Sequence, residues 1–112
     1  MNNIKNDKYY ILKTINEIQI IKEYSKNIKD YDDFLSDEKG LDAIMFRLIQ
    51  MIENIKNISP EFKNEHSDIP WGNILGFRNG IVHEYGETDY SDVYEIVMYD
   101  IVKLEKDLKT AI

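Results

Sequence analysis

Apolar residues recur every three or four positions along most of this chain, which is the spacing that lines one face of an α-helix. The pattern is most regular over residues 37–58, where the apolar positions are Leu41, Ile44, Met45, Leu48, Met51, Ile52, Ile55 and Ile58. Similar series predict a first helix over 7–28 and a last helix that runs to about Thr110. The inner face of that last helix is predicted to hold Tyr90, Val93, Val97, Ile101, Leu104 and Leu108. No segment alternates apolar and polar residues as a half-buried strand would.

Capping residues divide this pattern into elements, because Ser, Thr and Asp side chains satisfy the first N–H groups of a helix. The expected caps are Asp7, Asp30, Ser36, Ser59 before Pro60, and Thr88 or Asp89, while Gly86 is expected to end the helix before it. Residues 30–35 and 61–65 can form only short elements. The sequence therefore predicts an all-α fold, an antiparallel up-and-down helical bundle of four main helices plus one or two short helices, in a single domain over residues 1–112.

Polar side chains interrupt the apolar pattern in the helix predicted over 70–85. On a helix that turns about 100° per residue, Arg78 falls in the middle of the apolar stripe and Tyr85 is almost in line with it. Asn79 and His83, four residues apart, share the adjacent face. A guanidinium that faces the core must be paired or must line a wet cavity, since burying an unpaired charge is very costly.

Composition narrows the class of protein. The chain has 112 residues, a net charge of −7 and no cysteine, so broad nonspecific binding of nucleic acid and thiolate metal sites are both disfavoured. Lysines gather in residues 1–29 and acids in residues 30–42, so a nucleic acid would have to approach near the first helix and Arg78. No apolar run is long enough to span a bilayer, and no signal peptide is apparent, so we expect a soluble cytoplasmic protein without a membrane association.

The polar residues of the 70–85 helix could together cleave RNA. His83 could take a proton near neutral pH, and Arg78 could stabilise negative charge on a phosphate. Asn79 could orient the imidazole or bind the ligand, and Tyr85 could contact a phosphate or stack on a base. This chemistry requires neither a metal nor a cofactor. His66, the other histidine, is too far along the chain from His83 for a helical metal-ligand pair.

Ordinary structural roles remain open for the same residues. His83 could be a surface or hydrogen-bonded histidine, Arg78 could form a buried ion pair with Glu53 or an aspartate of another helix, and Tyr85 could lie at the edge of the core. Arg47 either borders the core or supports the site from a facing helix.

The order Arg78-x4-His83-x-Tyr85, with Asn79 directly after the arginine, resembles the signature of the HepT-like toxins of the HEPN superfamily. The likeness extends through 33–37, 41–44 and 46–50, and through Ile69-Pro70-Trp71 ahead of 74–79. It ends with Asp89-Tyr90 and the amphipathic stretch that follows, so it covers most of the chain.

This resemblance implies a homodimeric helical toxin of a prokaryotic toxin–antitoxin system, with a composite cleft between the two subunits. It implies a metal-independent endoribonuclease with Arg78, His83 and Asn79 as the catalytic residues. It also implies a cognate minimal nucleotidyltransferase antitoxin, which would add AMP to Tyr85 and so place negative phosphates beside Arg78. Phe77, outside the core stripe, is a candidate for the contact between subunits.

Two other functions compete with this one. The chain could be a non-catalytic dimeric module that binds a nucleotide or a protein through Arg78 and Tyr85. It could also be a structural four-helix scaffold in which Arg78 forms an internal salt bridge.

Overall fold

A computed structural model of the chain describes residues 3–81 and 90–112. Its long helices are α1 (Asn3–Ser25), α3 (Glu38–Lys56) and α5 (Trp71–Ile81), and its short ones are α2 (Tyr31–Ser36) and α4 (Pro60–Glu65). The last helical run consists of α6 (Tyr90–Glu95), the π-helical turn η1 (Ile96–Asp100) and α7 (Ile101–Ala111). No strand occurs within these two ranges, and the predicted all-α fold with four main and two short helices is confirmed.

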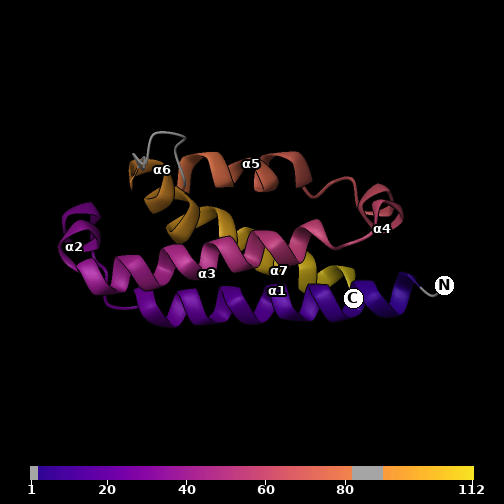
Figure 1. Cartoon of the computed structure of the whole chain (residues 1–112), viewed down its shortest axis with the longest axis horizontal. Helices are drawn as coiled ribbons and strands as arrows, with labels where there is room; N and C mark the ends of the chain where they lie inside the picture. The colour runs from indigo at the N-terminus through magenta and orange to yellow at the C-terminus, as the bar shows by residue number, and fades with distance from the viewer. Residues whose placement is uncertain (1–2, 82–89) are drawn as a thin grey trace.

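The long helices run antiparallel to their neighbours (Figure 1). The chain passes along α1, returns along α3, reverses through α4 into α5, and comes back along α6 to α7. As a result, α1 begins and α7 ends at the same end of the bundle. The bundle is elongated, with principal extents of 46, 30 and 21 Å.

The core lies along the apolar faces that the sequence predicted. Fully buried side chains come from each of the long segments and include Ile11, Ile18 and Ile21 in α1, Ile44, Leu48, Met51, Ile52 and Ile55 in α3, Ile81 in α5 and Ile101 in α7. Of the inner face predicted for the last helix, Val93, Val97, Ile101, Leu104 and Leu108 are buried, whereas Tyr90 is 39% exposed. Among the described helices none is long and apolar enough to cross a membrane.

The π-helical turn η1 was not predicted. The backbone N–H of Ile101 bonds to the carbonyl of Ile96, five residues earlier, and both side chains are buried. The apolar spacing from Val97 to Leu108 is equally compatible with a regular α-helix, so this change in hydrogen bonding leaves no clear mark in the sequence.

Two of the expected helix caps are wrong. Helix α1 begins at Asn3, so Asp7 lies inside it, and the carboxylate of Asp7 instead accepts hydrogen bonds from Ser59. The cap of α3 is Asp37, whose side chain accepts from the N–H of Gly40, and Ser36 belongs to α2. The caps at Asp30 and Ser59 are confirmed, since they accept from Asp33 and Phe62 respectively.

Candidate active site

Helix α5 carries the described part of the predicted site, and its first turn is anchored to the preceding loop. The indole Nε1–H of Trp71 donates to the carbonyl of His66 at 3.0 Å, and the N–H of Ile74 donates to the carbonyl of Pro70 at 3.1 Å. The ring of Phe62 in α4 lies against both His66 and Trp71, with centroids 4.3 and 6.3 Å away. These contacts set the direction in which α5 leaves the loop.

Arg78 is exposed, so the prediction that it faces the core is wrong for the single chain. The buried side of α5 is formed by Trp71, Ile74 and Ile81. Around the helix, the mean direction of these three side chains is about 30° from that of Arg78. At that angle a long side chain can keep its stem near the core and its charge in water.

No ion pair of Arg78 occurs among residues 3–81 and 90–112, which excludes the alternative of an internal salt bridge within that part of the chain. Glu53, the partner considered for it, lies 3.7 Å from the ammonium of Lys56 instead. Asn79, the next residue, is exposed as well. Two exposed polar residues that are consecutive in the sequence, Arg78 and Asn79, thus lie near the end of the described part of α5.

The remaining site residues, His83 and Tyr85, lie outside the described residues, as do Gly86, Thr88 and Asp89. Their predicted roles as proton carrier, modification site, helix end and caps stay predictions. Within the described chain, no group of three or more His, Cys, Asp or Glu side chains is arranged to hold a metal ion.

Arg47 makes its polar contacts with α1. One of its guanidinium nitrogens lies 3.2 Å from a carboxylate oxygen of Glu17, a buried residue in α1. A hydrogen bond with Tyr24 and the charge of Glu17, opposed by partial desolvation, raise the pKa of Arg47 above its ordinary value. Arg47 thus joins α1 to α3, and these contacts favour its role at the border of the core over support of a site on α5.

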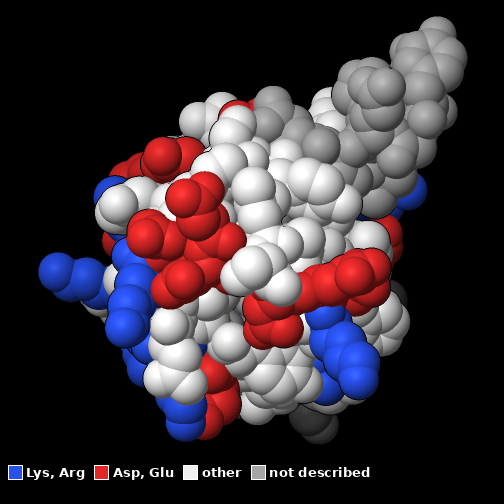
Figure 2. Space-filling model, turned by 90° about the vertical axis from the view of Figure 1, so that its left-hand side faces the viewer, with Lys and Arg blue, Asp and Glu red and all other residues white. Residues whose placement is uncertain are grey.

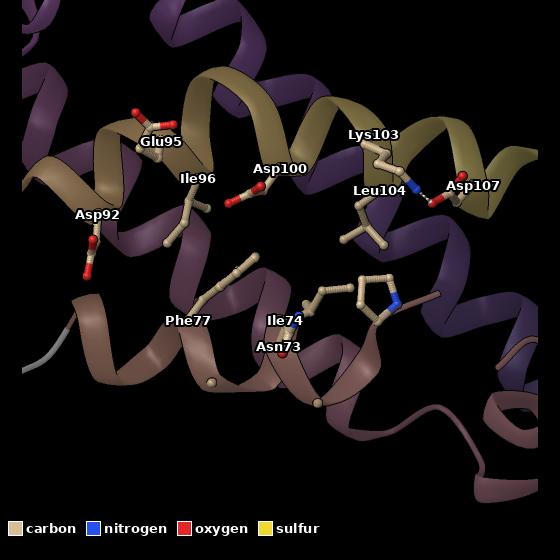
Figure 3. Close-up of a pocket in the computed structure, with 13 residues that line it drawn as sticks. Asn73, Ile74, Phe77, Asp92, Glu95, Ile96, Asp100, Lys103, Leu104 and Asp107 are labelled. Atoms are coloured by element: carbon tan, nitrogen blue, oxygen red, sulfur yellow. Dashed lines mark hydrogen bonds and ion pairs between the residues drawn. The ribbon is translucent and has the colours of Figure 1, made fainter. Parts of the chain in front are cut away.

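A groove of about 550 Å³ separates α5 from the last helical run. Its lining residues are Pro70, Gly72, Asn73, Ile74, Gly76, Phe77, Asp92, Glu95, Ile96, Asp100, Lys103, Leu104 and Asp107. Phe77, expected at a contact between subunits, is half-buried and points across this groove toward Ile96 and Asp100 (Figure 3). The sequence did not predict the groove, because its walls come from segments that are separated along the chain.

Comparison with known proteins places the chain in a family. The family model described as "Ribonuclease HepT-like" matches residues 14–111. A protein of Caldanaerobacter subterraneus subsp. tengcongensis that carries the provisional name of an RNase is 31% identical over 95% of this chain and 94% of its own length. A protein of Thermococcus cleftensis with the provisional name ribonuclease HepT is 31% identical over 90% of this chain and 91% of its own.

A longer relative is found in Methanocaldococcus jannaschii. It is named as a gamma-glutamylcyclotransferase and, provisionally, an RNase, and it is 32% identical over 93% of this chain but only 46% of its own length. No solved structure shows a significant match. The family model and the full-length similarity agree with the signature around Arg78, and the chain belongs to the HepT-like ribonuclease family.

Proposed function

We propose that this chain is a metal-independent endoribonuclease that acts as the toxin of a prokaryotic toxin–antitoxin system. Family membership supports ribonuclease activity. The observation that carries the proposal within the structure is that Arg78 and Asn79 are both exposed on α5. A guanidinium with no ion pair in the described part of the chain is available to bind the phosphate of an RNA.

The reaction we propose uses the 2′-hydroxyl of the RNA as the nucleophile. His83 removes the proton of that hydroxyl, and the 2′-oxygen forms a bond to the adjacent phosphorus. Arg78 stabilises the negative charge that develops on the phosphate oxygens, while Asn79 orients His83 or the substrate. The bond from phosphorus to the 5′-oxygen then breaks, and that oxygen takes up a proton. The products are a 2′,3′-cyclic phosphate and a 5′-hydroxyl end.

A homodimer is part of this proposal. Arg78 and His83 are five residues apart, which places them about 140° from one another on a straight helix. A second copy of α5 beside the first would let residues of both chains line a single cleft. The exposure of Arg78 in the single chain agrees with such an arrangement, since its charge is free to face a neighbouring subunit.

We further propose that a minimal nucleotidyltransferase is the antitoxin and that it adds AMP to Tyr85. Each added phosphate carries negative charge near Arg78 and would occupy the position of an RNA phosphate. The modified toxin would then no longer bind its substrate.

Expression of this chain in bacteria that lack the antitoxin tests whether it is a toxic ribonuclease. We expect the wild-type protein to stop growth and to yield RNA fragments with 2′,3′-cyclic phosphate ends. The purified protein should produce the same fragments when EDTA removes divalent metal ions. His83→Ala and Arg78→Ala should be harmless, whereas Lys39→Ala, which removes an exposed charge at the start of α3, should remain toxic. Equal growth with wild type and His83→Ala, at equal soluble expression, would contradict the proposal.

The wild-type protein and the His83→Ala variant also distinguish a ribonuclease from the competing function, a non-catalytic binding module. A non-catalytic binding module would bind a nucleotide or a protein tightly in wild type and in His83→Ala alike. It would cleave no RNA in either form.

A further inference from the structure

The groove between α5 and the last helical run has an apolar floor. Ile74 and Phe77 on α5 point toward Ile96 and Leu104 on the opposite wall (Figure 3). Ile74, Ile96 and Leu104 are each less than 5% exposed, whereas Phe77 is only half-buried. The floor therefore offers an aromatic surface that the described part of the chain does not fully cover.

Two of the α5 residues that line the groove, Gly72 and Gly76, have no side chain. A Cβ added at either position would meet no atom within 4 Å, so packing inside the chain does not require glycine there. Each glycine weakens a helix by about 0.5–1 kcal/mol relative to alanine. Absence of a side chain at both positions lets another chain come close to the backbone of α5.

The rim of the groove is acidic. Four of its lining residues are carboxylates, namely Asp92, Glu95, Asp100 and Asp107, and the single cation of the lining, Lys103, is held by Asp107 at 2.9 Å. Asp100 points into the groove above Phe77, whereas Glu95 is turned outward (Figure 3). Asp100 is exposed, but partial desolvation beside apolar side chains raises the pKa of its carboxylate above the ordinary value.

Charge separates this groove from the proposed RNA site, because an acidic rim repels phosphates. Acidic side chains also gather in clusters on the bundle end that α2 and α6 form, with Lys or Arg side chains at its margins (Figure 2).

We propose that this groove binds a basic amphipathic segment of another protein. Apolar side chains of that segment would cover Phe77 and Leu104, its backbone would approach Gly72 and Gly76, and its Lys or Arg side chains would pair with Asp100 and Glu95. A second groove of the same kind is a poor occupant, because its carboxylates would face those of the first. The inference does not depend on the ribonuclease activity proposed above.

The test uses a labelled amphipathic peptide of Leu and Lys, about 14 residues long, which spans about 21 Å as a helix. A peptide of the same length with Glu in place of Lys is the control. By fluorescence anisotropy with the full chain, we expect the Lys peptide to bind at least tenfold more tightly than the Glu peptide. Gly76→Leu, which adds a bulky side chain to the lining of the groove, and Asp100→Asn should each weaken the binding threefold to tenfold. Gly76→Ser provides a smaller obstruction if the leucine variant does not fold.

Control variants lie on exposed helix positions outside the groove. Gln50→Leu on α3 matches the added leucine, and Asp32→Asn on α2 matches the lost carboxylate. Failure of the Lys peptide to bind, or equal weakening by control and groove variants, would overturn the proposal. It would also be overturned if Gly76→Leu selectively abolished RNA binding, or if it dissociated a homodimer in sedimentation experiments, since the groove would then hold RNA or a second copy.

Discussion

The carboxylate of Asp7 accepts two hydrogen bonds from Ser59, from the backbone N–H and from the hydroxyl, each at 2.7 Å. The same hydroxyl oxygen accepts the N–H of Phe62 at 3.1 Å and so caps α4. Asp7 is only 4% exposed. Helix α1 therefore holds the turn that connects α3 to α4, on the path that leads to the proposed active site.

Replacing Asp7 by alanine should destabilise the protein by about 2–3 kcal/mol, because it removes two hydrogen bonds to a charged acceptor. Urea unfolding at pH 7, followed by the fluorescence of Trp71, measures this loss. Asp42→Ala, which removes an exposed carboxylate, should change the free energy of unfolding by less than about 0.5 kcal/mol. Equal stability of the Asp7 and Asp42 variants would show that the link to Ser59 contributes nothing.

Gly72→Ala and Gly76→Ala should each stabilise the protein by about 0.5–1 kcal/mol, since a methyl group meets open space at both positions. Gly40→Ala should do the opposite, because its Cβ would collide with the carboxylate of Asp37, which caps α3. Thermal unfolding of the three variants compares them directly. A loss of stability in Gly76→Ala would mean that the space above α5 is filled in solution.

Glu105 on α7 ties the last helix to α1. Its buried carboxylate lies 2.9 Å from the ammonium of Lys22 and 3.5 Å from that of Lys109. Burial disfavours its ionisation, but these lysines outweigh that effect and lower its pKa below the ordinary value. Glu105→Gln should destabilise the protein by about 1 kcal/mol at pH 7.

The contribution of Glu105 to stability should also depend on pH. Because its pKa is lower in the folded state, the contribution is complete above the unfolded-state value of about 4.3 and is lost as the pH falls through the folded-state value. Urea unfolding of wild type and Glu105→Gln at several pH values should show the difference between them shrinking below about pH 4. A constant difference at all pH values would contradict this.

Arg78→Ala should leave the free energy of unfolding unchanged within about 0.5 kcal/mol, because Arg78 is exposed and makes no ion pair in the described part of the chain. The same substitution should reduce RNA cleavage about 100-fold or more, as expected for a group that stabilises the transition state. Lys106→Ala, at an exposed position on α7, should change neither property. A large loss of stability in Arg78→Ala would instead indicate the structural scaffold.

Apolar periodicity was sufficient to predict the number and order of the long helices and the inner face of α3. Burial of one face requires apolar residues at helical spacing, and this requirement acts within each segment of the chain. The caps at Asp30 and Ser59 were also predictable, because each accepts a hydrogen bond from a residue only three positions later in the same segment. The resemblance to the HepT-like family was recognisable from residue types and spacing alone, and the family model confirms it.

Other features depend on contacts between segments that are far apart in the sequence. Asp7 was predicted to cap its own helix, but its partner, Ser59, is 52 residues away. Arg78 was placed at the centre of the apolar stripe of α5, but the side of α5 that is buried is decided by how it packs on α3 and α6. The groove likewise exists only because α5 lies beside η1 and α7. Local sequence patterns determine which residues form helices, whereas packing between helices determines which faces remain open for binding.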